Sequence, residues 1–147
     1  MNTLRVKRIY PDAVIPRRAS NGSVGYDLFA YTTDEIEIKP GETRPVGTGI
    51  AIALEEGFAA FVYARSGLGI KHGINPANGV GVIDYDYRGE IIVGLRNSSG
   101  SAFVIKPFDR IAQMVITQCM LPTLEVCEDL DSTQRGDNGF GSTGGGV

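Results

Sequence analysis

The stretch IAIALEEGFAAFVY, residues 50–63, decides the fold class of this chain of 147 residues. Apolar side chains fall two positions apart over residues 50–54, Glu56-Gly57 is a turn signal, and a second apolar run covers residues 58–63. A period of two places alternate side chains on opposite faces of a β-strand. Further short apolar runs, separated by turn signals, lie at residues 36–38, 81–83, 91–95, 103–105 and 111–116. This succession of strands and turns predicts an all-β sandwich or barrel.

One short helical turn is the expected exception. We place it near residues 66–71, with Ser66 as its N-terminal cap, because a Ser side chain accepts hydrogen bonds from the first unpaired backbone N–H groups of a helix. No other window of about 11 residues carries a clear helical period.

The C-terminal sequence STQRGDNGFGSTGGGV, residues 132–147, differs in composition from the rest of the chain. Phe140 is its one large apolar residue before Val147, so it cannot pack a core by itself. We expect residues 1–131 to form one β-barrel domain and residues 132–147 to form a flexible, Gly-rich arm. Two interpretations of the arm stay open: a frayed terminus, and a segment that closes over a phosphorylated, planar ligand with Arg135 and Phe140.

Charge and hydropathy argue against several classes of partner. The net charge is −3 and the isoelectric point is about 5.1, whereas proteins that hold a nucleic-acid backbone usually present a basic face. No stretch approaches the ~18 apolar residues of a membrane span, and the start lacks the apolar run of a signal peptide. We therefore expect a soluble, cytoplasmic protein without direct nucleic-acid or membrane contacts. Of the 14 basic residues 10 are Arg, so small anionic ligands remain candidates.

Cysteine and histidine content limits the possible chemistry further. Cys119 and Cys127 have the spacing of neither a disulfide framework nor a CxxC metal motif. His72 is the single histidine, which supports neither a catalytic triad nor a His-based metal site, and we interpret it as a surface residue.

A carboxylate at the end of a predicted strand is the first candidate for catalysis. The sequence NGVGVIDYDYRGE, residues 78–90, places Asp84 directly after an apolar run and before a turn. A carboxylate in this position can deprotonate or orient a water molecule. The alternative is a hairpin in which the Asp side chains bond to the backbone of the turn.

Three other stretches have the composition of anion-binding sites. In ARSGLG, residues 64–69, an Arg and a Ser precede the predicted helical turn, which is either an anion site or an ordinary capped turn. In GFGSTG, residues 139–144, glycines allow successive backbone N–H groups to converge on an anion, although no Lys follows as in a Walker A loop. In DRIAQM, residues 109–114, Gln113 lies in an apolar strand and must either bond to backbone or face a ligand.

Five stretches of the sequence, taken together and in order, resemble the motifs of a known protein family, although no single stretch is specific enough to do so. VGYDLFA (24–30), ARSGLG (64–69), NGVGVIDYDYRGE (78–90), DRIAQM (109–114) and RGDNGFGSTG (135–144) resemble, in order, the five motifs of the homotrimeric dUTPase family. The resemblance implies a jelly-roll-like β-barrel that forms a homotrimer with active sites at subunit interfaces. It also implies hydrolysis of dUTP to dUMP and diphosphate, which keeps uracil out of DNA and supplies dUMP for dTMP synthesis.

The resemblance also implies roles for single residues. Asp84 resembles the acid that activates water for attack on the α-phosphorus, and Asp27 resembles a supporting acid of the first motif. Mg²⁺ is implied as a cofactor held by substrate phosphates and water, with no direct protein ligand. The residues implied in binding base and sugar are Asn78, Gly79, Val82, Ile83, Tyr87 and Phe140. Those implied in binding phosphate are Arg65, Ser66, Gly67, Gln113, Arg135, Gly141, Ser142 and Thr143.

Two rival functions follow from the same motifs. The fold also resembles that of dCTP deaminases, which need a Glu to activate water against C4 of cytosine, and Glu90 follows the predicted hairpin. A protein of this shape can also act as a non-enzymatic binder that regulates a partner. Ammonia release from dCTP distinguishes the first rival, and loss of Asp84 or of the arm would be expected in the second.

Overall fold

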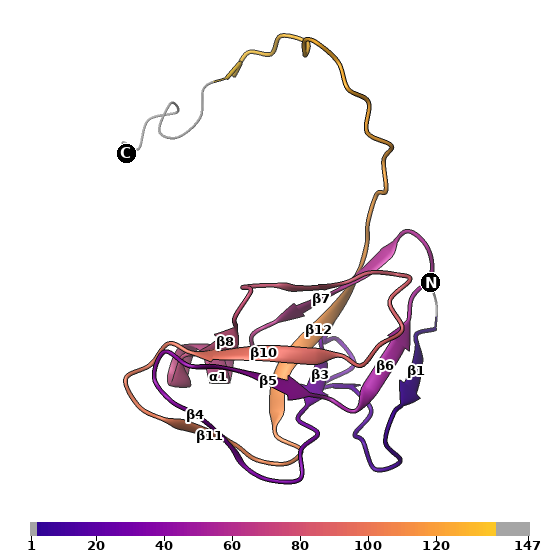
Figure 1. Cartoon of the computed structure of the whole chain (residues 1–147). Coiled ribbons are helices and arrows are strands. Elements are labelled where there is room, and N and C mark those ends of the chain that lie inside the picture. The colour runs from indigo at the N-terminus through magenta and orange to yellow at the C-terminus, as the bar shows by residue number, and fades with distance from the viewer. Residues whose placement is uncertain (1–2, 138–147) are drawn as a thin grey trace.

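Strands dominate the computed structural model, which describes residues 3–137 (Figure 1). In this part of the chain they form four sheets. The largest has the order β2 (Arg17–Arg18), β3 (Tyr26–Phe29), β12 (Arg110–Gln118), β7 (Phe58–Tyr63) and β9 (Gly81–Ile83). A second sheet has the order β5 (Thr43–Gly47), β10 (Ile92–Asn97) and β8 (Ile74–Pro76). The remaining two are the pairs β1 (Arg5–Arg8) with β6 (Ile50–Ala53), and β11 (Phe103–Ile105) with β4 (Ile36–Ile38). The all-β prediction is therefore confirmed.

The central strand β12 brings distant motifs side by side. It pairs antiparallel with β3 and with β7, so Gln113 lies opposite Asp27 on one side and Tyr63 on the other. A register shift between Arg110 and Ala112 interrupts the β3 pairing. Because such a bulge adds an extra residue to one strand, it breaks the alternation of buried and exposed side chains at this end of β12.

A single apolar core fills the space between the sheets. Its fully buried members include Leu28 of β3, Ile38 of β4, Ile50 of β6, Leu95 of β10 and Met114 of β12. These residues come from all four sheets, with Leu28 and Met114 from the same one, so burial of this core joins the sheets into one unit.

The one helix among the described residues, α1 (Ser66–His72), follows β7 directly. The prediction that Ser66 caps it is wrong, because Arg65 is the N-cap and no side chain makes a capping hydrogen bond. The N–H of Gly69 donates to the carbonyl of Arg65 at 2.8 Å, so the first helical bond already begins at Arg65 and Ser66 is inside the helix. His72 at the other end of α1 is exposed, as interpreted from the sequence.

The chain leaves the barrel after β12 and runs away from it (Figure 1). Three large apolar side chains of this segment are almost fully exposed: Leu124 at 90%, Val126 at 98% and Leu130 at 86%. The predicted division between residues 1–131 and 132–147 stays a prediction. Within residues 3–137, no helix is both long and apolar enough to span a membrane.

Candidate active site

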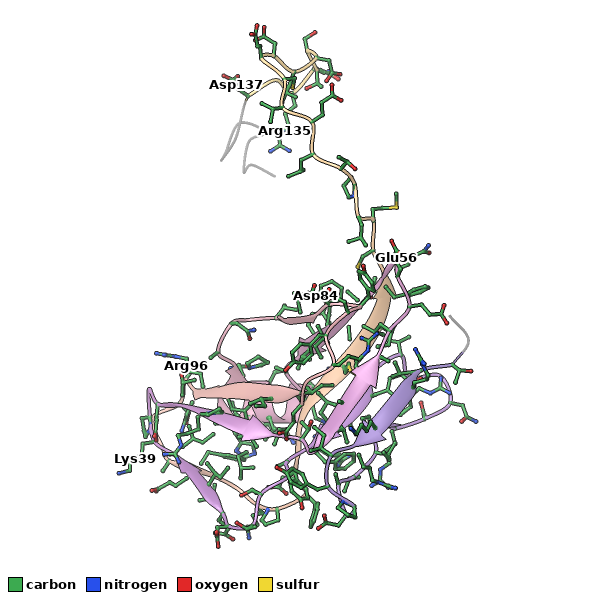
Figure 2. All side chains as sticks on the ribbon, turned by 45° about the vertical axis from the view of Figure 1, so that its right-hand side comes forward. Lys39, Glu56, Asp84, Arg96, Arg135 and Asp137 are labelled. Atoms are coloured by element: carbon green, nitrogen blue, oxygen red, sulfur yellow. The ribbon has the colours of Figure 1, made fainter. Side chains whose placement is uncertain are left out.

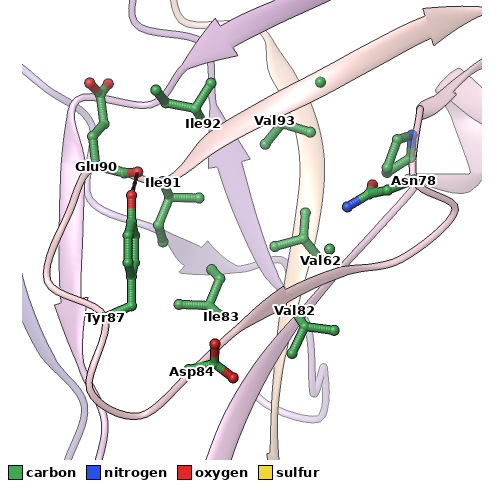
Figure 3. Close-up of a pocket in the computed structure, with 13 residues that line it drawn as sticks. Val62, Asn78, Val82, Ile83, Asp84, Tyr87, Glu90, Ile91, Ile92 and Val93 are labelled. Carbon is green, nitrogen blue, oxygen red and sulfur yellow. Dashed lines mark hydrogen bonds between the residues drawn. The ribbon is translucent and has the colours of Figure 1, made fainter.

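A cavity of about 250 Å³ lies between β9 and the start of β10 (Figure 3). Its lining includes the predicted site residues Asn78, Val82, Ile83, Asp84 and Tyr87. Within the described residues β9 is the last strand of its sheet and pairs only with β7. The backbone groups along its other edge are therefore available to a ligand. A pocket with apolar walls and an open strand edge suits a planar group that forms hydrogen bonds.

Gly79 shapes the approach to this cavity without lining it. Its φ of +73° belongs to the left-handed region that favours glycine, and its N–H donates to the carbonyl of Pro76 at 3.0 Å. This tight turn leads the chain from β8 into β9 and leaves Asn78 exposed at the cavity rim.

Asp84 sits at the end of β9, where the sequence predicted a carboxylate. The residue is exposed, and its side chain has no hydrogen-bond or ion-pair partner among residues 3–137. Only its backbone carbonyl takes part in the turn, by accepting the N–H of Tyr87 at 3.2 Å. The alternative, in which the carboxylate bonds to the turn backbone, is not observed. The carboxylate is thus available to a water molecule or ligand in the cavity.

Tyr87 and Glu90 occupy the other wall of the cavity. The hydroxyl of Tyr87 donates to the backbone carbonyl of Glu90 at 3.0 Å. Figure 3 shows the ring of Tyr87 between Asp84 and Glu90, with the Glu90 carboxylate directed away from Asp84. That carboxylate accepts the backbone N–H of Gly49 at 2.8 Å. Glu90 is therefore engaged with the barrel rather than directed at the space beside Asp84.

A second cluster of predicted residues centres on Asp27. This carboxylate is buried and accepts Nε of Arg65 at 2.7 Å and Nη1 of Arg110 at 3.4 Å. Arg65 keeps 24% of its side chain exposed and Arg110 keeps 50%. Since one carboxylate faces two guanidinium groups, the cluster retains a positive charge that can attract phosphate.

Gln113 completes this second cluster. Its amide nitrogen donates to the backbone carbonyl of Ala64 at 2.9 Å, so of the two alternatives the backbone partner is the one observed. The bond ties β12 to the segment that carries Arg65 and the exposed Ser66 and Gly67. The two predicted phosphate-binding stretches around Arg65 and Gln113 therefore lie together at one end of the large sheet.

The two clusters lie apart within one chain. Ile83 pairs with Ala60, so Asp84 follows toward one end of β7, whereas Arg65 follows the other end. At the rise of a β-strand this separation is roughly 20 Å. Arg135 is not brought to either cluster, because it lies on the segment that leads away from the barrel (Figure 2). Phe140, Gly141, Ser142 and Thr143 lie outside the described residues.

Sequence reasoning missed two contacts of these clusters. Arg110 was not predicted to take part, although it begins the strand that carries Gln113 and reaches Asp27 across 83 positions. The bond from Gly49 to Glu90 was missed as well, since a half-buried Glu after a turn carries no signal of its distant partner. Asp27 thus orients two arginines, and Glu90 binds a backbone N–H of the turn between β5 and β6.

Comparison with known proteins identifies the family. The dUTPase family profile matches residues 12–144. A deoxyuridine 5'-triphosphate nucleotidohydrolase of Desulfitobacterium hafniense is 46% identical to this chain, over 98% of the chain and 99% of its own length. The dUTPase of Staphylococcus bacteriophage 80alpha, solved with dUPNHPP, is 27% identical with a TM-score of 0.87 and covers 98% of this chain and 99% of its own.

A third comparison concerns the fold alone. A dUTPase of phage phi11 of S. aureus, described with a structural Mg(II) ion, is 24% identical with a TM-score of 0.79 and covers 89% of this chain and 100% of its own. The barrel described above is accordingly the jelly-roll-like β-clip that the sequence predicted. On the match of its sequence and its structure, the chain belongs to the dUTPase family.

Proposed function

We propose that this chain hydrolyses dUTP to dUMP and diphosphate, and so keeps uracil out of DNA and supplies dUMP for dTMP synthesis. The observation that carries the proposal is the cavity beside β9, where among residues 3–137 a carboxylate without a partner, Asp84, lies with a tyrosine ring and an open strand edge. It lies in a chain whose curated relatives are named deoxyuridine 5'-triphosphate nucleotidohydrolase. We place the reaction in the cytoplasm, with the nucleotide pool.

The base binds along the edge of β9 in this proposal. In this proposal the backbone from Gly79 to Ile83 pairs with the edge of the uracil where β9 has no neighbouring strand among the described residues, and Asn78 at the rim adds an amide. Fixed backbone groups pair with uracil and reject the reversed pattern of cytosine, because a mismatch leaves buried polar groups unpaired. Val82 and Ile83 line this cavity, and we infer that they leave no room for the methyl group of thymine.

Asp84 and Tyr87 act on the sugar and the attacking water. The ring of Tyr87 packs under the deoxyribose, where a 2′-hydroxyl would collide with it. The carboxylate of Asp84 holds a water molecule and takes its proton as the oxygen attacks the α-phosphorus and diphosphate leaves. Water is a poor nucleophile at neutral pH, so orientation and a nearby base are what the reaction needs from the protein.

The phosphates bind to the cluster around Asp27. Arg65 is presented by Asp27, and the exposed Ser66 and Gly67 follow it at the start of α1. The Gln113 amide has a second N–H besides the one donated to Ala64, and in this proposal the second N–H contacts the α-phosphate. In the C-terminal segment Phe140 stacks on the uracil, and Arg135 clamps the γ-phosphate together with residues 141–143. Charge-assisted contacts from Arg are the expected means of holding a triphosphate.

Mg²⁺ fits this arrangement as an ion that arrives with the substrate. Among residues 3–137 no group of three or more His, Cys, Asp or Glu side chains could hold a metal ion. In this proposal the ligands of the cation are phosphate oxygens and water, which is how Mg²⁺ is commonly bound beside a nucleotide. When bound, Mg²⁺ neutralises negative charge on the phosphates during attack.

A homotrimer with shared active sites is the assembly we propose. Within one chain Asp84 and Arg65 are too far apart to act on one triphosphate, so a second copy must supply the missing cluster. The exposed apolar side chains Leu124, Val126 and Leu130 offer a surface that self-association would bury. Three copies, rather than two, follow from the family resemblance.

No observation favours either rival function. A deaminase would need Glu90 directed at the base, but the Glu90 carboxylate is engaged with the N–H of Gly49. A non-enzymatic binder has no need of a carboxylate such as Asp84, which lies beside an open cavity and has no partner in the described part of the chain.

Release of diphosphate from dUTP, dTTP, dCTP and UTP in parallel, with Mg²⁺ present, tests the proposal. We expect release from dUTP and little from the other three. Release from none of them would exclude the activity, ammonia release from dCTP would turn the assignment to a deaminase, and equal release from all four would exclude the proposed pocket.

A further inference from the structure

The position of the Tyr87 ring is set by its hydroxyl group. The residue is 46% exposed, so packing alone does not fix its ring. Its hydroxyl donates to the backbone carbonyl of Glu90 at 3.0 Å, which draws the ring back over the turn and along the cavity wall (Figure 3). Gly89 makes this possible, since a Cβ atom at that position would lie 2.6 Å from Cζ of Tyr87.

Glu90 is in turn tied to a distant part of the barrel. Its Oε1 accepts the N–H of Gly49 at 2.8 Å, a contact between residues 41 positions apart. The space for this carboxylate is provided by Gly47, where a Cβ atom would lie 2.6 Å from the same oxygen. The turn between β5 and β6 is therefore shaped around the Glu90 side chain.

The residue after Glu90 is anchored to the same turn. The carbonyl of Ile91 accepts the backbone N–H of Thr48 at 3.1 Å and its hydroxyl at 2.7 Å. The N–H of Ile91 donates to the carbonyl of Ile50 at 2.9 Å. The turn at residues 47–50 thus holds both Glu90 and Ile91, and with them the peptide group whose carbonyl accepts the Tyr87 hydroxyl.

We propose that Glu90 is a positioning residue for Tyr87 and thereby for the rejection of a 2′-hydroxyl on the substrate sugar. The inference rests on the proposed function for the identity of the substrate. The Glu90 side chain acts only as a hydrogen-bond acceptor for Gly49, and its negative charge takes no part in the reaction. The Glu90→Gln variant distinguishes this positioning role from that of an acid or base, because glutamine keeps an acceptor oxygen at the same place but cannot exchange a proton in the same way.

The test compares the ratio of kcat/KM for dUTP to kcat/KM for UTP in four variants. Glu90→Gln should keep the wild-type ratio. Glu90→Ala and Tyr87→Phe should each lower it by about two- to tenfold, the usual weight of one hydrogen bond. Combining Glu90→Ala with Tyr87→Phe should lower the ratio little further than either change alone, because both changes release the same ring. Glu56→Ala, a change at an exposed turn outside the cavity, is the matched control.

Three outcomes would overturn the inference. Loss of activity in Glu90→Gln would mean that the charge takes part in the reaction. An unchanged ratio in Glu90→Ala with a lower melting temperature would leave Glu90 only a structural role. If Glu90→Ala does not fold, an unchanged ratio in Tyr87→Phe decides against the inference.

A crystal structure of the Glu90→Ala variant separates this inference from the proposed function. We expect the Tyr87 hydroxyl to have left the carbonyl of residue 90. A ring that stays in place would overturn the inference whether or not the wild-type protein hydrolyses dUTP, whereas a wild-type protein inactive on dUTP would overturn the proposed function alone.

Discussion

Arg65 donates from Nε to Oδ1 of Asp27 at 2.7 Å, although 38 positions separate the two residues. Asp27 is 8% exposed and also accepts Nη1 of Arg110, so one buried carboxylate orients two arginines that reach solvent. Asp27 therefore shapes the site by fixing the positions of two guanidinium groups. A phosphate that binds there contacts arginines that are already oriented.

Replacing Asp27 with Asn should destabilise the protein and weaken substrate binding. The change leaves Arg65 and Arg110 without their anionic partner, and loss of a buried charge-assisted bond costs about 1–3 kcal/mol. Urea unfolding measures the stability, and KM for dUTP reports the binding. Glu35→Gln is the control, since its pair with Lys106 is exposed at 3.7 Å and should contribute less than about 1 kcal/mol. Equal effects of the two substitutions would contradict the role of Asp27.

The carboxylate of Glu42 should make the free energy of unfolding depend on pH in the acidic range. The backbone N–H of Lys39 donates to its carboxylate at 2.9 Å, and with the nearby Arg44 this lowers the pKa of Glu42 from the usual 4.5. A lowered folded-state pKa gives stability that is present above 4.5 and is lost as the pH falls through the folded-state value. Thermal unfolding of Glu42→Gln should therefore begin lower than that of the wild type at pH 7, and the gap should close below pH 4.5.

The control for this pH effect is Glu37→Gln. Glu37 is exposed on β4 and its side chain has no partner among residues 3–137, so this variant should unfold like the wild type at either pH. A gap for Glu42→Gln that stays constant from neutral to acid pH would show that the hydrogen bond to Lys39 does not distinguish the charged from the neutral carboxyl.

Apolar patterning predicted the strands that carry a clear apolar run, but it missed β3 and β8, which also bury side chains. The strands predicted at residues 36–38, 58–63, 81–83 and 103–105 match β4, β7, β9 and β11. Strands β1, β2 and β5 have the sequences RVKR, RR and TRPVG, which carry little apolar surface. They are strands because a distant partner pairs with them, and a local pattern carries no information on such a partner.

The candidate site was likewise predicted only where local sequence determines it. The type and order of residues in each motif predicted a carboxylate at a strand end and an Arg beside a helix start, and both are observed. The contacts between these residues could not be predicted. The pairing of Arg110 with Asp27 and of Gly49 with Glu90 depends on strand register, and so does the separation of Asp84 from Arg65. Register joins residues far apart in sequence, and it is set by the whole core rather than by any motif.

Deleting residues 139–147 should impair turnover and leave the assembly intact. The deletion removes Phe140, whose stacking on the base would be worth about 1–3 kcal/mol, so kcat/KM for dUTP should fall by roughly 5- to 150-fold. Light scattering measures the assembly and diphosphate release measures turnover. Deletion of residues 145–147 alone, beyond the motif, should change neither. Dissociation of the longer deletion into monomers would assign this segment to assembly instead.

Asp84→Asn should keep nucleotide binding and lose hydrolysis. Asn has the shape of Asp and can still contact a water molecule, but it cannot take the proton as the water attacks, so kcat should fall by at least ~10²-fold. Calorimetric titration with a non-hydrolysable dUTP analogue measures binding, and single-turnover hydrolysis of dUTP measures chemistry. Asp86→Asn is the matched control, because Asp86 lies in the same turn, is exposed and does not line the cavity. If Asp84→Asn turns over like the wild type while Asp86→Asn does not, the base is Asp86, and the cavity beside β9 holds the substrate from a different side.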